Sequence, residues 1–321
     1  MGEMNNAIVC YLSDKARFAD LINAEIYGGR QVIKPDGLTE ISSTTYRKKA
    51  RAESDDPPKR KENRGDIVMK YEDGRIYRLI LMEAQDKVSY VFPLRSIEYL
   101  LAQYMKQMSE ITAGHKKKED YGSIDEKFSG INREDRLKPE YIIWLYHGEK
   151  PWDGPRTLKD MMDFGDDSDG FSSLFQDFNP HLVCVNELKT TEKYTTELRE
   201  LLDLLIARPD RHTIKRLILE DDRFDRLDED TYETASILLK APAIWKNRKS
   251  YLSDDEGRSY NMCKALEDWE AEIRAESAEE IQRMETQIEQ KDAQIEQKDA
   301  QIVKLQNEIA SLQAQLAAGM N

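Results

Sequence analysis

Residues 66–85, DIVMKYEDGRIYRLILMEAQ, decide the fold because they predict a β-hairpin with polar residues at its open end. Asp73-Gly74 is a dipeptide that a two-residue type I′ turn prefers, since both central residues of that turn need positive φ. Counting outward from such a turn pairs residues whose numbers sum to 147, which places Asp66 opposite Leu81.

The open end of this hairpin gathers oxygen-bearing side chains. Because side chains alternate with a period of two, Glu83 and Gln85 share the face of Leu81 and therefore of Asp66, and Glu83 becomes the diagonal neighbour of Asp66. Carboxylate oxygens on a strand pair suit a hard divalent cation such as Mg²⁺. The spacing therefore predicts a metal site formed by Asp66 and Glu83.

An ordinary sheet surface would also carry two acids and a glutamine, so the surrounding residues matter. The run Leu79–Met82 is apolar throughout, and Ile67–Met69 is apolar on both faces, which indicates strands buried on both sides. A charged residue at the end of a buried strand is costly without a partner or a metal. This favours the metal site over a solvated surface.

The chain resembles a known family at this point. An Asp, a hairpin of this length and Glu-x-Gln, where many nucleases have Glu-x-Lys, resemble the PD-(D/E)xK nuclease core of the bacterial recombination-promoting nuclease and transposase (Rpn) family. The resemblance covers roughly residues 8 to 250. Other segments agree in order: Leu12–Asn23 as an opening helix, Tyr90–Arg95 leading into a helix with Tyr99, Tyr104 and Gln107, and Tyr141–Trp152 followed by Asp153-Gly154-Pro155.

The resemblance implies an α/β fold with a central mixed sheet flanked by helices, and metal-dependent cleavage of DNA phosphodiesters. It implies that Asp66 and Glu83 bind the metal and that Gln85 stands where the wider nuclease group has a catalytic lysine. Glutamine can orient groups by hydrogen bonds but carries no positive charge. Lys87, on the same face of the strand, either supplies that charge or is a solvated lysine at the strand end.

An acid from the first helix often completes such sites. Asp14, Asp20 and Glu25 are the available candidates, and spacing singles out none of them.

Charge restricts how this protein can contact DNA. A net charge of −14 argues against nonspecific coating of nucleic acid, so any contact needs a local basic patch. The segment Thr44–Gly65 has eight basic residues against four acids and reads as a flexible loop, either a solvated linker or a phosphate clamp. A second basic run, His115–Lys118, is also expected in a loop.

The cellular location follows from cysteine usage and hydropathy. Cys10, Cys184 and Cys263 lie far apart without a Cys-x-x-Cys pair, which is typical of a reducing compartment. The first residues lack the pattern of a signal peptide, and no stretch approaches a membrane span. We therefore expect a cytoplasmic protein with no membrane partner.

Hydrophobic periodicity outlines the remaining elements. Residues 94–112 predict a helix whose apolar stripe packs in the core, and Trp152 is expected as a packing anchor. Strands are predicted at Tyr141–Tyr146 and Leu182–Val185, and helices at Thr195–Ala207 and Asp228–Leu239. The expected domains are 1–186 as nuclease-like core, 187–265 as helical subdomain and 266–318 as coiled coil.

The tail carries a heptad repeat, and IEQKDAQ occurs twice in succession from Ile288 and Ile295. Isoleucine at a with leucine at d favours a parallel dimer, although lysines at two successive d positions weaken its middle. A single long helix that docks another protein is the alternative. The a positions are Ile281, Ile288, Ile295, Ile302, Ile309 and Leu316, and the d positions are Met284, Lys291, Lys298, Leu305 and Leu312.

Two functions remain open from the sequence. The first is a metal-dependent DNA endonuclease linked to recombination or mobile elements, acting as a homodimer through the coiled coil. The second is a catalytically weak or inactive nuclease-fold protein that serves as an assembly or binding module.

Overall fold

The computed structural model describes residues 3–40, 66–72, 77–166, 170–253 and 259–318. The side chains of Asp66, of Tyr77–Glu83 and of the residues after Gln313 are not among those described. The chain forms two compact units, Met1–Ala265 and Leu266–Asn321. Residues 1–186 and 187–265 therefore belong to one unit.

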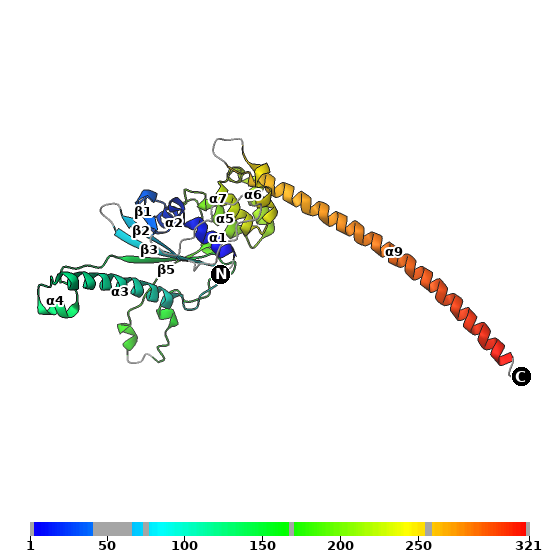
Figure 1. Ribbon diagram of the computed structural model, residues 1–321, viewed down its shortest axis with the longest axis horizontal. Coiled ribbons are helices and arrows are strands. Elements are labelled where there is room, and N and C mark those ends of the chain that lie inside the picture. The colour runs from blue at the N-terminus through cyan, green and yellow to red at the C-terminus, as the bar shows by residue number, and fades with distance from the viewer. Residues whose placement is uncertain (1–2, 41–65, 73–76, 167–169, 254–258, 319–321) are drawn as a thin grey trace. The chain divides into compact units, whose positions relative to one another are not determined.

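A five-stranded mixed sheet forms the centre of the first unit, in the order β1-β2-β3-β4-β5 (Figure 1). β1, β2 and β3 are antiparallel, whereas β3, β4 and β5 are parallel. Parallel neighbours need a crossover connection, which α3 provides between β3 and β4. The strands are β1 (Leu38–Glu40), β2 (Asp66–Glu72), β3 (Tyr77–Gln85), β4 (Glu140–Tyr146) and β5 (His181–Cys184).

The register of the hairpin differs from the predicted one by two residues. Asp66 pairs with Glu83 and Glu72 with Tyr77, so paired numbers sum to 149 and Asp66 is not opposite Leu81. Four residues, 73–76, separate the strands in place of a two-residue turn, and these four lie outside the described residues. Because the shift is even, every residue keeps its predicted face.

Two helices precede the sheet where the sequence predicted one over Leu12–Asn23. They are α1 (Glu3–Leu12) and α2 (Lys15–Tyr27). Asp14 separates them as the N-cap of α2, accepting hydrogen bonds from the backbone of Ala16 and Arg17. Gly28, with φ of 62°, ends α2 in the left-handed conformation that glycine tolerates best.

The helix predicted at 94–112 is confirmed but is longer, as α3 (Phe92–Lys118). His115–Lys118 forms the last turn of this helix, so the prediction of a loop there is wrong. The expected apolar packing is also wrong in part, because Leu94, Leu101 and Met105 are more than half exposed. α3 buries Phe92 and Ser96 instead, so the stripe toward the core begins two residues earlier.

Aromatic side chains fill the core between α3 and the sheet. The rings of Phe92 and Trp144 lie 5.0 Å apart edge to face, and those of Tyr146 and Trp152 lie 5.1 Å apart. The role of Trp152 as a packing anchor is thus confirmed. The cluster consists of Val68, Phe92, Ile142, Trp144, Tyr146, Trp152 and Cys184.

Gly148, just after β4, lies at a crowded junction. A Cβ atom there would overlap the hydroxyl oxygen of Tyr146 and the carbonyl oxygen of Asp86. Tyr146 uses that hydroxyl to donate a hydrogen bond to the carbonyl of Lys150, 2.8 Å away. Glycine therefore allows the loop after β4 to close over the end of β3.

The helical segment after the sheet packs back on α1 and α2. Its helices are α5 (Leu198–Ala207), α6 (Arg211–Glu220), α7 (Glu229–Leu238) and α8 (Pro242–Lys246), so the two predicted helices are confirmed. The buried Arg17 of α2 holds Asp228 and Asp230 at the start of α7, at 2.5 and 3.2 Å. The remaining helices are α4 (Ile124–Ser129) and the short 3-10 helices Pro35–Gly37, Lys159–Met161, Phe171–Leu174, Val185–Glu187, Asp222–Asp225 and Arg248–Tyr251.

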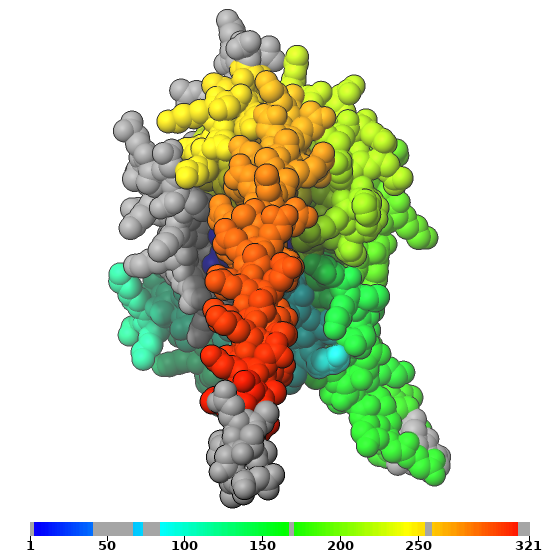
Figure 2. Space-filling model, turned by 90° about the vertical axis from the view of Figure 1, so that its right-hand side faces the viewer, coloured from blue at the N-terminus to red at the C-terminus, as the bar shows by residue number. Residues whose placement is uncertain are grey.

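The second unit is the main part of one helix, α9 (Met262–Ala318). Its apolar heptad residues from Ile281 to Leu312 are about half exposed, from 49% for Met284 to 57% for Ile288, and Figure 2 shows side chains that stand out along the visible side of the helix. An apolar stripe of this length is the surface that a coiled coil buries. No helix in the described part of the chain is both long and apolar enough to span a membrane.

Candidate functional site

The strand register at the open end of the β2–β3 ladder places the two predicted acids opposite each other. Asp66 and Glu83 are direct partners, and residues so paired in antiparallel strands have Cβ atoms about 4.5–5.5 Å apart on one face. Their carboxylates lie outside the described residues. The backbone places them closer than the predicted diagonal arrangement would.

Gln85, the third predicted residue, lies two positions further along β3 on the same face. β4 runs beside it, pairing Trp144 with Glu83 and Tyr146 with Gln85. The amide nitrogen of Gln85 and the indole nitrogen of Trp144 are buried, and neither has a hydrogen-bond partner among the side chains that the structure describes. Buried polar groups are nearly always satisfied, so these two N–H donors are available to an acid of the same face, to a water or to a ligand.

A positive charge reaches this face from the first turn of α3. The guanidinium carbon of Arg95 lies 5.0 Å from the centre of the Trp144 ring, and its Nη2 donates to the Tyr99 hydroxyl at 2.9 Å. Trp144 is the neighbour of Glu83 on the next strand. Arg95 therefore lies one strand away from the predicted metal ligand, a proximity that follows from the crossover of α3.

The opposite face of the same sheet end holds a buried polar cluster that the sequence analysis missed. Asn5 of α1 donates to Asp86, just after β3, at 3.3 Å. His147 is 1% exposed, and neither ring nitrogen has a hydrogen-bond partner within the described part of the chain. Burial, with the charge of Arg208 adding to it, lowers the pKa of His147 to about 4, so its imidazole is neutral at physiological pH.

Backbone bonds tie this cluster to the end of β3. The N–H of His147 donates to the carbonyl of Gln85 at 3.0 Å, and Arg208, the C-cap residue of α5, donates to the carbonyl of His147 at 2.7 Å. The cluster thus holds the backbone of Gln85 from the face of the sheet opposite to its side chain. Only the Tyr-His-Gly sequence at the end of a strand could have signalled it, because Asn5 and Arg208 belong to distant segments.

The three candidate acids of the first helix serve structural roles. Asp14 is the N-cap of α2. Asp20 is 2% exposed and accepts hydrogen bonds from both backbone N–H groups and both hydroxyls of Thr195 and Thr196, at 2.7–3.0 Å. Glu25 accepts a short bond from the Tyr194 hydroxyl and pairs with Lys193 at 2.8 Å. Asp14 therefore caps a helix, and Asp20 and Glu25 hold α2 against residues 193–196.

Two of the candidate basic groups lie near opposite ends of α3. Lys87 follows the end of β3 and is exposed, as a solvated lysine would be. His115 bonds Asp120 and Asp135 at 2.6 and 2.8 Å, while the segment Thr44–Gly65 falls outside the described residues.

Among the residues whose side chains are described, no group of three His, Cys, Asp or Glu is arranged to hold a metal ion. That set does not include Asp66 and Glu83. The donors available at the sheet end are nevertheless oxygens from two acids in direct register, which fit a hard cation that keeps several waters.

No family model, curated protein or solved structure significantly matches this chain.

Proposed function

We propose that this chain is a metal-dependent DNA endonuclease with a PD-(D/E)xK-like core. The observation that supports this most is the pairing of Asp66 with Glu83 at the end of a mixed sheet flanked by helices. Two separate segments thereby place acids side by side, with Gln85 next on the same face. The resemblance to the recombination-promoting nuclease family includes these same three residues, together with the ordered segments from Leu12 to Pro155.

Each residue has a defined task in this proposal. Asp66 and Glu83 hold a divalent cation such as Mg²⁺, which when bound neutralises charge on the phosphate and lowers the pKa of a water. Gln85 orients the water or a phosphate oxygen through its amide. No covalent nucleophile is needed. Incubation of purified protein with supercoiled plasmid, with and without Mg²⁺ or Mn²⁺, tests the activity.

Arg95 is the group that we expect to supply the charge missing at Gln85. Arg95→Met should lower the rate of metal-dependent nicking about 10- to 100-fold, because the positive charge over Trp144, one strand away from Glu83, is lost. Lys87→Met is the matched control and should stay within about twofold, since Lys87 is solvated beyond the strand. Initial rates of plasmid nicking measure both. A larger loss for Lys87→Met would assign the charge to that lysine.

The proposal includes a parallel homodimer through α9. In that arrangement the d lysines Lys291 and Lys298 lie beside Asp292 and Asp299 of the partner at e positions, so opposite charges offset the cost of polar core layers. Sedimentation should give twice the chain mass for the full protein and a single chain mass for a chain ending near Ser277. If both proteins sediment with the same number of chains per particle, α9 does not form the dimer.

An assembly or binding module without turnover is the second candidate. The glutamine at position 85 and the exposed heptad stripe of α9 favour it. Under this alternative the protein sediments as a dimer but leaves plasmid intact with either metal. Cys10, Cys184 and Cys263 form no disulfide among the described residues, which supports placing either form of the protein in the reducing cytoplasm.

A further inference from the structure

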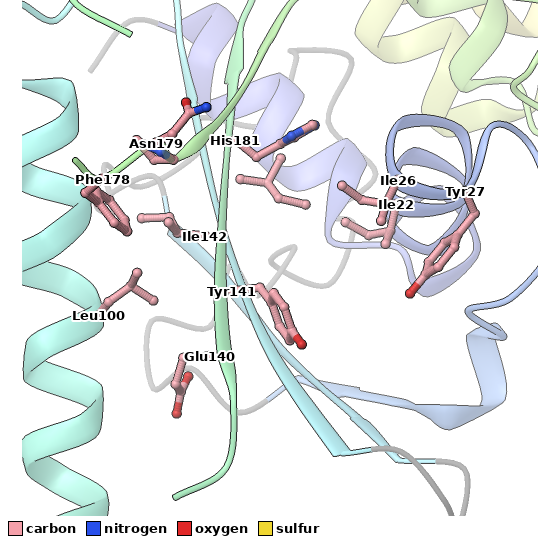
Figure 3. Close-up of a pocket in the computed structure, with 12 residues that line it drawn as sticks. Ile22, Ile26, Tyr27, Leu100, Glu140, Tyr141, Ile142, Phe178, Asn179 and His181 are labelled. Atoms are coloured by element: carbon pink, nitrogen blue, oxygen red, sulfur yellow. The ribbon is translucent and has the colours of Figure 1, made fainter. Parts of the chain in front are cut away.

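Residues 119–139 connect α3 to β4, and side-chain contacts hold this segment where it enters the strand. Gln107 of α3 donates a hydrogen bond to the carboxylate of Glu140, the first residue of β4. Figure 3 shows Glu140 and Ile142 on the side of β4 where Leu100 of α3 lies. The β4 end of the segment is therefore attached to α3 by packing as well as by a hydrogen bond.

At its other end the segment is attached through one imidazole. His115 lies in the last turn of α3, the end of the helix at which Figure 1 shows α4. The Nδ1 of His115 lies 2.6 Å from a carboxylate oxygen of Asp120, and its Nε2 lies 2.8 Å from a carboxylate oxygen of Asp135. Asp135 also accepts the backbone N–H of Asn132 at 2.6 Å. His115 thus joins two separate parts of the segment to the helix.

This arrangement needs both ring nitrogens to carry a proton. An ionised carboxylate only accepts hydrogen bonds, so each nitrogen of His115 must donate, and only the imidazolium form has two N–H groups. A neutral ring has one N–H and one lone pair, and the lone pair would face a carboxylate. Loss of one proton therefore breaks one of the two contacts.

The position of His115 favours the charged form. Its side chain is 15% exposed, and it lies at the C-terminal end of a 27-residue helix, where the helix dipole stabilises a cation. The carboxylates of Asp120 and Asp135 are 44% and 25% exposed, so the cluster lies at the surface and exchanges protons with solvent.

Basic groups near the cluster act on the aspartates and on the backbone. The bond from His115 lowers the pKa of Asp120, and the charge of Lys118 adds to this effect. The Nη1 of Arg136 donates to the backbone carbonyl of Asp135 at 2.7 Å. These cations support the aspartates as acceptors for the histidine.

α4 and the turn before it supply the other titratable groups beside the cluster. The ring of Tyr121 lies 5.6 Å from that of His115, and Glu126 of α4 accepts the backbone N–H of Arg133 at 2.8 Å. Histidine is the residue type in this set that titrates closest to neutral pH.

We propose that His115 is a proton-dependent latch, whose doubly protonated ring holds residues 119–136 on the end of α3 and whose deprotonation releases one aspartate and loosens that segment. Ile124 and Phe128 of α4 are 87% and 90% exposed, so the latch controls the mobility of an exposed apolar pair. This proposal is independent of the nuclease activity.

The pH response has one direction. The hydrogen bonds to Asp120 and Asp135 raise the pKa of His115 above 6.5, although partial burial opposes them. A group whose pKa is raised by folding stabilises the structure fully below its unfolded pKa, and this contribution is lost as pH rises through the folded pKa. The latch should therefore be closed at about pH 6 and should open as pH rises above the folded pKa of His115.

Pulsed hydrogen exchange of the full-length protein tests the latch at the backbone N–H of Asn132. Protection of this N–H, relative to an unstructured peptide at the same pH, should fall at least about fivefold between about pH 6 and about pH 8.5. In His115→Gln the protection should not change with pH, because glutamine does not titrate. His212→Gln is the matched control, since His212 is exposed in the first turn of α6, and it should respond as the parent protein does.

Two further measurements address the proton itself. Asp135→Asn should remove the pH response, because an amide can donate to a neutral ring nitrogen as well as accept from a protonated one. Shifts of the histidine ring protons should give His115 a higher titration midpoint than His212. The proposal is overturned if protection of Asn132 does not change with pH, if it changes equally in His115→Gln, or if His115 titrates at or below the midpoint of His212.

Discussion

Asp66→Ala is expected to abolish cleavage of supercoiled plasmid in Mg²⁺ or Mn²⁺, lowering the rate at least about 100-fold. Asp66 is the first residue of β2 and the direct partner of Glu83, so its removal takes away one of two paired acids. A single remaining carboxylate holds a divalent cation weakly. Nicking rates across a metal titration should show loss of activity that added metal does not restore.

The control for this variant lies on the same strand. Glu72→Ala removes an exposed acid from the other end of β2, where Glu72 pairs with Lys70 at 2.6 Å. It should retain full activity. In urea denaturation, the free energy of unfolding of both variants should equal that of the parent protein within about 0.5 kcal/mol. Metal-dependent nicking that survives in Asp66→Ala would refute the site.

Asp20→Asn is expected to lower the free energy of unfolding by about 3 kcal/mol, because Asp20 is a buried acceptor. Its two oxygens receive four donors from Thr195 and Thr196, and this contact joins α2 to the start of the helical segment. An asparagine amide would direct an NH₂ group at donors. Urea denaturation followed by circular dichroism measures the loss.

Asp14→Asn provides the matched comparison for Asp20→Asn. Asparagine caps a helix as well as aspartate does, so this change at the N-cap of α2 should alter stability by no more than a few tenths of a kcal/mol. If instead Asp20→Asn unfolds like the parent protein but loses plasmid cleavage, Asp20 belongs to the functional site and its structural role here is wrong.

Local pattern was sufficient to predict the central strands. The run from Tyr141 to Tyr146 is apolar throughout because β4 is covered on both faces, and it appears where it was expected. The register of the hairpin was not predictable from its turn, since four residues rather than two connect the strands. The face of each residue was still correct, because that depends only on whether the shift is even or odd.

The surroundings of the site could not be read from local pattern. Asp20 and Glu25 have the composition of candidate catalytic acids, but Thr195, Tyr194 and Lys193 reach them from more than 160 residues away. Arg95 meets Trp144 only because α3 crosses back over the sheet. Long-range partners of this kind decide which polar residues are structural, and periodicity carries no information about them.

The crowded position of Gly148 has a consequence for ancestry. Even a methyl group there would strike the Tyr146 phenol and the Asp86 main-chain carbonyl, and loss of the aromatic ring would remove only the first of these two clashes. Gly148 should therefore be retained even where Tyr146 is replaced. Glycine as the second residue after a buried strand is a fingerprint by which diverged descendants of this chain could be recognised.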